Sequence, residues 1–131
     1  MFGTPETALP FPLDSGDSLA TKLLRYRDRA HRTHCVTAAN QVVKTLAAMG
    51  IKALIYGDLT RHEEEFTSKS GIDICIIDDP GFHSHSGPLF HQIQEAVHEA
   101  ALGLPIDFVF LSCMPPETVQ HILRTGCPRV D

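Results

Sequence analysis

The segment S-G-I-D-I-C-I-I at residues 70–77 decides how this 131-residue chain folds. Six successive residues, 72–77, form a mostly apolar run, and the turn sequence D-D-P-G closes it, which is typical of a buried strand. Because successive side chains of a strand point to opposite faces, Asp73, Cys75 and Ile77 share one face and three isoleucines share the other. The segment therefore predicts a strand with one ionisable residue set among apolar neighbours.

Two further apolar runs predict the rest of a sheet. One is I-K-A-L-I-Y at residues 51–56, which ends at a glycine, and the other is I-D-F-V-F-L at residues 106–111. Residues 58–70 are polar and charged, so we expect a connecting loop there, with room for one helical turn. The chain thus predicts three short strands.

Apolar residues spaced by three and four positions predict helices around these strands. We place the helices at residues 19–49, 89–101 and 117–124. The first begins after Asp17 or Ser18, ends at Gly50, and is either continuous or broken near residues 31–34. The order helix, strand, strand, helix, strand, helix predicts an α/β (α+β) fold, a small mixed β-sheet covered by helices.

The composition is that of one globular domain. Apolar residues make up 43% and charged residues 21% of the chain. Residues 1–16 are rich in Pro and Gly, so we expect an extended or flexible N-terminal arm ahead of a domain at residues 17–131. The arm lacks the basic start and apolar centre of a secretory signal, and no apolar stretch is long enough for a membrane span. We therefore expect a cytoplasmic protein.

The four cysteines show no C-x-x-C spacing. Cys75 lies inside an apolar run and Cys113 follows one, whereas Cys35 and Cys127 stand apart from both. We expect buried free thiols rather than a disulfide or zinc framework.

Charge is distributed unevenly along the chain, whose formal net charge is −5. Residues 17–50 hold six Lys/Arg against two acids, a net of +4. Residues 51–131 hold five against twelve, a net of −7, and residues 1–16 contribute −2. Such a basic cluster either faces phosphates or an acidic partner, or forms a solvated helix face. Its members are Lys22, Arg25, Arg27, Arg29 and Arg32.

Two predicted strands carry an acid at their second position, Asp73 in one and Asp107 in the other. Burying an ionised carboxylate among apolar residues is costly without a compensating charge. Two such acids on neighbouring strands suit a shared cation, and Mg²⁺ takes oxygen ligands from one or two carboxylates plus phosphates. The alternative is that both acids lie at solvent-exposed strand ends.

The same segments, in this order, resemble the minimal nucleotidyltransferases of the DNA polymerase β superfamily. The family pattern is an apolar strand ending in Gly-Ser, an Asp-x-Asp at the start of the next strand, and a third Asp on a later strand. Here the corresponding stretches are I-Y-G-D-L-T-R, S-G-I-D-I-C-I-I and P-I-D-F-V-F-L. The resemblance covers about residues 39–130 and implies a nucleotidyltransferase-like domain.

The resemblance also implies nucleotide-binding residues. Gly57 matches the family glycine, which lets the backbone approach nucleotide phosphates closely, and Arg61 matches the family arginine in the loop. Asp58 stands where the family has a serine that helps to hold the triphosphate. A fixed negative charge about 4 Å from a phosphate costs on the order of 4 kcal/mol at an effective dielectric of 20. Nucleotide binding is therefore expected to be weakened.

The catalytic and metal-binding acids implied by the resemblance are Asp73 and Asp107. Gly71 stands where the first Asp of Asp-x-Asp should be, so two of the three expected catalytic acids are present. Active members hold two Mg²⁺ ions with three carboxylates, and such a pair needs bridging oxygens. Either the site is impaired by Gly71, or Asp58 substitutes as a metal ligand.

Two functions from different classes follow from the resemblance. The first is a binding protein with a degenerate site, similar to the antitoxin half of toxin–antitoxin gene pairs, whose partner is a helical protein. The alternative is an active Mg²⁺-dependent enzyme that moves NMP from an NTP to a hydroxyl acceptor. A module that binds an NTP without turnover is a third reading. A domain this small also suggests association with itself or with another chain.

Other polar clusters are less specific. His83, His85 and His91 either bind a transition metal or form a polar surface. The acids at residues 63–65 either lend carboxylates to a site or form a solvated loop. No P-loop, nucleophile elbow or interleaving of basic and aromatic residues is visible, so sequence-specific nucleic-acid binding is not expected.

Overall fold

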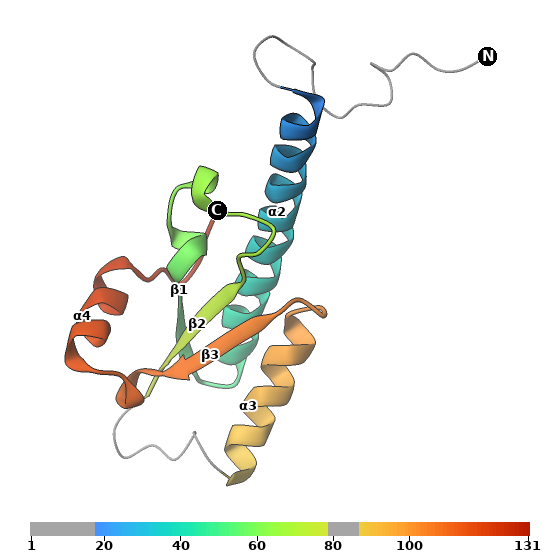
Figure 1. The fold of residues 1–131 in the computed structure, drawn as a ribbon. Helices are drawn as coiled ribbons and strands as arrows, with labels where there is room; N and C mark the ends of the chain where they lie inside the picture. The colour runs from blue at the N-terminus through green and yellow to red at the C-terminus, as the bar shows by residue number, and fades with distance from the viewer. Residues whose placement is uncertain (1–17, 79–86) are drawn as a thin grey trace.

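The computed structural model describes residues 18–78 and 87–131 of the chain (Figure 1). The predicted N-terminal arm and the histidines at positions 83 and 85 lie outside the described residues. The described elements, in order, are α2 (Leu19–Ala48), β1 (Lys52–Tyr56), η1 (Gly57–Thr60), η2 (Glu63–Glu65), β2 (Ile72–Ile77), α3 (Gly87–Ala100), β3 (Ile106–Phe110), η3 (Leu111–Cys113) and α4 (Pro116–Thr125).

The long helix α2 is continuous over 30 residues. It begins at Ser18, whose hydroxyl accepts a hydrogen bond from the backbone N–H of Thr21 (3.1 Å). It ends at Ala48, and Gly50, two residues further on, has a φ of +80° and donates its N–H to the carbonyl of Ala47 (2.9 Å). No break occurs near residues 31–34, a stretch without Pro or Gly.

The three strands form one mixed sheet in the order β1-β2-β3. β1 pairs antiparallel with β2, and β2 pairs parallel with β3. The connection from β2 to β3 runs through α3, which is the usual way for a chain to return to a parallel neighbour. β3 ends one residue earlier than predicted, because Leu111 begins a short 3-10 turn whose Ser112 donates its backbone N–H to Asp78 Oδ1 (2.9 Å).

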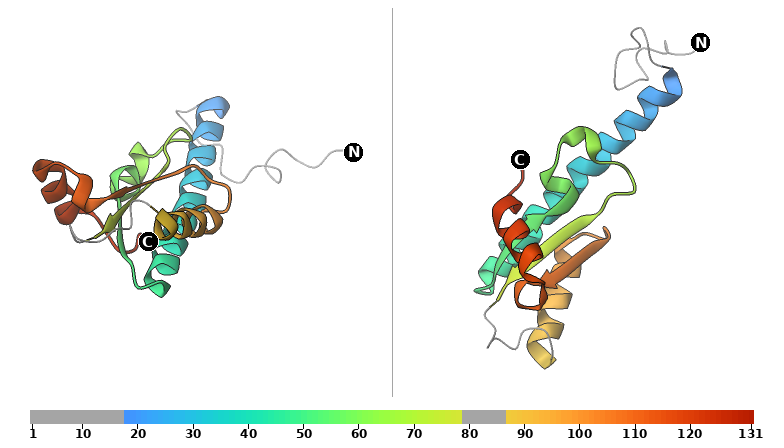
Figure 2. Two further views of the ribbon diagram at one scale, coloured as in Figure 1. Left: turned by 90° about the horizontal axis from the view of Figure 1, so that it is seen from below. Right: turned by 60° about the vertical axis from the view of Figure 1, so that its left-hand side comes forward.

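Helices α2 and α3 cover one face of the sheet, as Figure 1 and the right-hand view of Figure 2 show. Ile72, Ile74 and Ile76 of β2 point into this layer and are 0–1% exposed. An aromatic group formed by Phe90, Phe108 and Phe110, with ring centroids 6.0–6.2 Å apart, extends the core towards β3. The predicted small mixed sheet covered by helices, an α+β fold, is confirmed.

The opposite face of the sheet is covered in part by α4 and the C-terminal segment. Ile122 of α4 is 1% exposed, and Gly126 lies against the side chain of Leu54. The segment then runs along the outer edge of β1, where Ile55 and Cys127 exchange two backbone hydrogen bonds (2.7 and 2.8 Å). β1 therefore has β2 on one side and this bridge to the C-terminal segment on the other.

All four cysteines are free thiols, as expected. The expectation that they are buried is correct for Cys35 and Cys75 but wrong for Cys113, which is exposed, and for Cys127, which is half-buried. Cys113 lies in η3, a 3-10 turn at the surface, and not within a strand. None of the helices in the described residues combines the length and the apolar character that crossing a bilayer requires.

Candidate functional site

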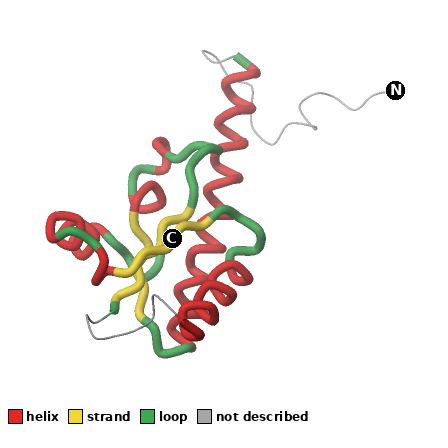
Figure 3. Tube along the Cα trace, turned by 60° about the horizontal axis from the view of Figure 1, so that its bottom comes forward, coloured by secondary structure: helices red, strands yellow, loops and turns green. Residues whose placement is uncertain are grey.

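Asp73 and Asp107 lie next to each other on the sheet. They are register partners on the parallel strands β2 and β3, so their side chains point to the same face. Tyr56 of β1 is the register partner of Asp73 on the other side. The row Tyr56–Asp73–Asp107 lies on the face opposite α2 and α3; Figure 3 shows the strands between that helix pair and the shorter α4.

The turn after β1 packs directly against this row. Gly57 has a φ of +77°, in the left-handed region that favours glycine. A Cβ atom at this position would lie 2.6 Å from Oδ2 of Asp73, closer than real Cβ contacts allow. The structure thus brings together Gly57, Asp73 and Asp107, as the sequence predicted.

The other two predicted nucleotide-binding residues pair with each other. Oδ1 of Asp58 lies 3.3 Å from Nη1 of Arg61 within the turn that follows β1, and both side chains are exposed. Thr60 closes the same turn by donating its hydroxyl to the carbonyl of Gly57 (2.7 Å). The charge of Asp58 is therefore partly compensated from within the turn.

Negative charge accumulates at the row. Burial raises the pKa of Asp73 above its ordinary value of 3.8, and the neighbouring charges of Asp107 and Asp58 raise it further, while Arg61 opposes them. The pKa of Tyr56 is also raised, first by burial and then by Asp73, Cys75 and Asp107. Asp107 and Asp58 therefore lie close enough to Asp73 to disfavour its ionisation.

Gly71 lies directly before the first residue of β2 and leaves space there. A Cβ atom there would have only the carbonyl oxygen of Pro105 within 4 Å, at 3.7 Å, an ordinary contact. Its backbone is not left-handed, and in an extended chain residue 71 points to the same side as residue 73. An aspartate would fit at this position without strain.

The carboxylates present do not fit a two-metal centre. Among residues 18–78 and 87–131, no three His, Cys, Asp or Glu side chains come together in an arrangement that could hold a metal ion. Asp58 therefore does not complete a three-acid set with Asp73 and Asp107. Two carboxylates can contribute two ligands to one cation, whereas paired ions also need bridging oxygens.

The remaining candidates lie elsewhere. His91 is exposed on α3, the helix that covers the opposite face of the sheet, and the acids at residues 63–65 form η2 beside α2. Tyr56 is the one member of the row that was not predicted. Its position at the end of the first predicted strand, directly before Gly57, is the sequence feature that could have identified it.

No protein-family model, no curated protein and no solved structure matches this chain. What the site can do therefore rests on its own geometry.

Proposed function

We propose that this protein has a nucleotidyltransferase-like site that is impaired for catalysis, and that it acts mainly by binding a partner protein or a nucleotide. One observation carries the proposal. Asp73 and Asp107 lie side by side next to Gly57, in the arrangement that the resemblance implies, but Gly71 provides no third carboxylate.

The physical argument concerns charge. In this reaction class, catalysis is almost entirely positioning and neutralisation of phosphate charge by metal ions. With two carboxylates the site holds a metal weakly, while Asp58 adds a negative charge where a triphosphate would approach. Arg61, in the same turn, already pairs with Asp58. These features favour binding without efficient transfer.

Gly71 supplies a direct test, because a side chain fits there. Label transfer from radiolabelled ATP in the presence of Mg²⁺, and Mg²⁺ binding by calorimetry, are measured for the wild type, Gly71→Asp and the matched neutral variant Gly71→Asn. We expect no transfer by the wild type, and Mg²⁺ affinity at least about tenfold higher in Gly71→Asp alone, the scale of one added charged ligand. Wild-type transfer that Asp73→Ala abolishes would overturn the proposal.

The binding role is tested separately. The resemblance implies a helical partner encoded by the neighbouring gene, so the two proteins are co-expressed and the complex is isolated. We expect a stable complex that persists in Asp73→Asn and Asp107→Asn, since neither acid is needed for association. Loss of the complex in either variant, with the fold intact by circular dichroism, would contradict a role independent of the carboxylates.

One observation favours the alternative, an active nucleotidyltransferase. The charge of Asp58 is close enough to raise the pKa of Asp73, so a small movement could bring its carboxylate into the site. In that case Asp58→Asn would abolish transfer by the wild type. Under the proposal, Asp58→Asn instead strengthens ATP binding, because it removes a repulsive charge. Calorimetry with the four NTPs distinguishes the two outcomes.

A further inference from the structure

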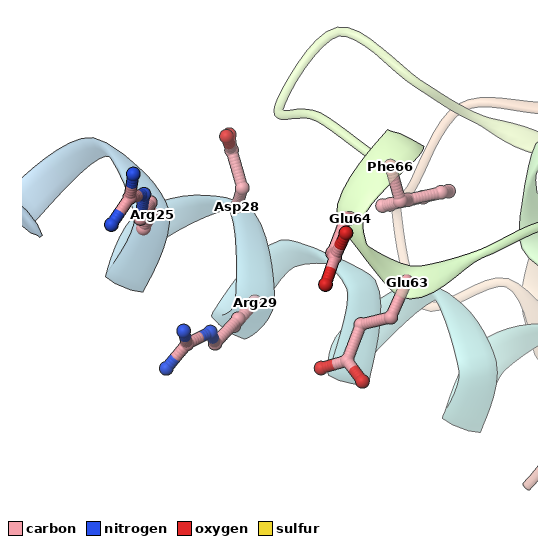
Figure 4. Close-up of a pocket in the computed structure, with 6 residues that line it drawn as sticks. All are labelled: Arg25, Asp28, Arg29, Glu63, Glu64 and Phe66. Atoms are coloured by element: carbon pink, nitrogen blue, oxygen red, sulfur yellow. The ribbon is translucent and has the colours of Figure 1, made fainter. Parts of the chain in front are cut away.

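A charged groove lies between α2 and η2, away from the row of Tyr56, Asp73 and Asp107. Its volume is about 680 Å³. Figure 4 shows arginines extending from α2 on one side and glutamates extending from η2 on the other. The lining residues are Arg25, Asp28, Arg29, Glu63, Glu64 and Phe66.

Specific contacts hold the two walls of the groove in place. Oδ1 of Asp28 accepts a hydrogen bond from the backbone N–H of Ser68 (2.8 Å), and Nε2 of His31 donates to the carbonyl of Ser70 (2.8 Å). Phe66, which is 2% exposed, stacks on His31 with ring centroids 5.5 Å apart. The loop that carries η2 is therefore fixed to α2, and the groove between them is a built feature of the fold.

Arg29 on the α2 wall and the two glutamates of the η2 wall carry opposite charges on either side of this groove. Within residues 18–78 and 87–131, no ion pair joins Arg29 to Glu63 or Glu64. All three side chains belong to exposed residues. The groove thus carries Arg29 on its α2 wall and Glu63 and Glu64 on its η2 wall. A partner that presents the same two walls in the opposite order would place a negative charge against each positive one.

We propose that this partner is a second copy of the chain, bound through a twofold axis that passes through the groove. In such an isologous contact, residue i of one copy meets residue j of the other, and j meets i. Arg29 of each copy then faces Glu63 and Glu64 of its partner. One patch supplies both halves of the interface. This inference does not depend on the proposed function.

Two further observations favour self-association. The first is long-range charge complementarity, because residues 17–50 carry +4 and residues 51–131 carry −7, so the α2 wall of one copy attracts the acidic remainder of another. The second is Leu24, 50% exposed one turn before Asp28, on the side of α2 that carries the groove. It provides apolar surface for the contact to bury. Exposed ion pairs are individually weak, so the dimer is weak and sensitive to salt.

Charge reversal with subunit mixing tests the proposal. Sedimentation velocity at low salt is measured for the wild type, Arg29→Glu and Glu63→Arg, each alone, and for an equimolar mixture of the two variants. We expect the wild type to form dimers as its concentration rises, and each variant alone to associate at least tenfold more weakly. The mixture regains dimers, because the substituted residues 29 and 63 then meet with opposite charges. The unchanged Arg29 of the second chain still faces Glu63 and Glu64 of the first, so only the contact of the substituted residue 29 with Glu64 is repulsive.

Matched controls separate this effect from a change in net charge. Lys44→Glu on α2 and Glu95→Arg on α3 make the same charge changes at exposed positions outside the groove, and should dimerise like the wild type. The double variant Arg29→Glu/Glu63→Arg should also dimerise. A wild type that is monomeric at every concentration overturns the proposal. The proposal is also overturned if the double variant dimerises but the mixture does not, because residues 29 and 63 would then pair within one chain.

Discussion

Gly57 packs its bare Cα against the carboxylate of Asp73, so that a Cβ atom at residue 57 would lie 2.6 Å from Oδ2. The turn after β1 and the acid on β2 are thus fitted to each other. Two separate constraints act on this glycine. One is the left-handed backbone, with a φ of +77°, and the other is the contact with Asp73.

Substituting Gly57→Ala should therefore lower the free energy of unfolding by about 2–3 kcal/mol. The left-handed backbone accounts for about 1–2 kcal/mol of this, and displacement of the Asp73 side chain for the rest. Urea denaturation measures the difference. Gly50→Ala and Gly103→Ala are matched controls, because both glycines have a similar φ and nothing within 4 Å of an added Cβ.

A double-mutant cycle isolates the contact itself. In the background of Asp73→Ala, Gly57→Ala should cost no more than Gly50→Ala costs in the wild type, since only the backbone strain remains. An undiminished cost in that background would show that the carboxylate does not constrain residue 57.

Asp73 should make stability depend on pH. Burial and the charges of Asp107 and Asp58 raise its pKa in the folded state above the unfolded value near 3.8, so the folded protein holds this proton more tightly. The stability that Asp73 contributes is fully present below pH 3.8 and is lost as pH rises through the folded pKa. At pH 7 the ionised carboxylate is therefore a net cost.

Asp73→Asn should be more stable than the wild type at pH 7, by about 0.5–1 kcal/mol, the scale of a like-charged cross-strand pair. The difference should vanish as pH falls towards 3.8. Thermal unfolding from pH 3 to 8 measures it. Asp131→Asn at the exposed C-terminus is the control, and its effect should not follow this profile. A gain in Asp73→Asn that persists unchanged at pH 3 would exclude charge as the cause.

The sheet could be predicted from the sequence because its signals are local. The run at residues 72–77 alternates an acid and isoleucines over one strand, and β2 has the predicted bounds. Placing Asp73 beside Asp107 also followed from the second position that each acid holds in its strand. Because the connection through α3 makes β2 and β3 parallel, the second residues of the two strands lie opposite each other as register partners.

The loop between β1 and β2 could not be predicted in the same way. Its shape depends on polar contacts with α2, formed by Asp28 and His31 with backbone groups some 40 residues away. Such contacts leave no periodic trace in the sequence. The sequence left room for one helical turn in this loop, where the structure has the two short turns η1 and η2. The groove beside them appears only in three dimensions. Cys113 was misplaced for a similar reason, since nothing in its apolar surroundings marks the surface turn that exposes it.

Asn40 should be important for holding the C-terminal segment. Its side chain donates from Nδ2 to the carbonyl of Val130 (2.7 Å) and accepts at Oδ1 from the N–H of the same residue (2.9 Å). Asn40→Ala removes both hydrogen bonds and should cost about 1–3 kcal/mol. Urea denaturation measures this. Gln41→Ala, at the next and exposed position, is the control and should lie within about 0.5 kcal/mol of the wild type.

The four thiols should differ sharply in reactivity. The thiolate is the reactive form of cysteine. Burial, together with the charge of Asp78, raises the pKa of Cys75 to about 11, and burial also raises the pKa of Cys35. At pH 8 only about one in a thousand Cys75 thiols is ionised, even before access is considered. Both side chains are 0% exposed, so a reagent reaches them only when the structure opens.

Labelling with a thiol reagent at pH 8, followed by mass spectrometry of peptides, should therefore modify Cys113 first and Cys127 more slowly. Cys35 and Cys75 should react at least about 100-fold more slowly than Cys113, at a rate that follows opening of the fold. Cys113→Ser should abolish the fast phase and leave the others unchanged. Equal protection of all four thiols would mean that η3 is covered in solution. Rapid labelling of Cys75 would instead mean that α4 and the C-terminal segment do not stay on the outer face of the sheet, and the row of Tyr56, Asp73 and Asp107 would then be open along its whole length.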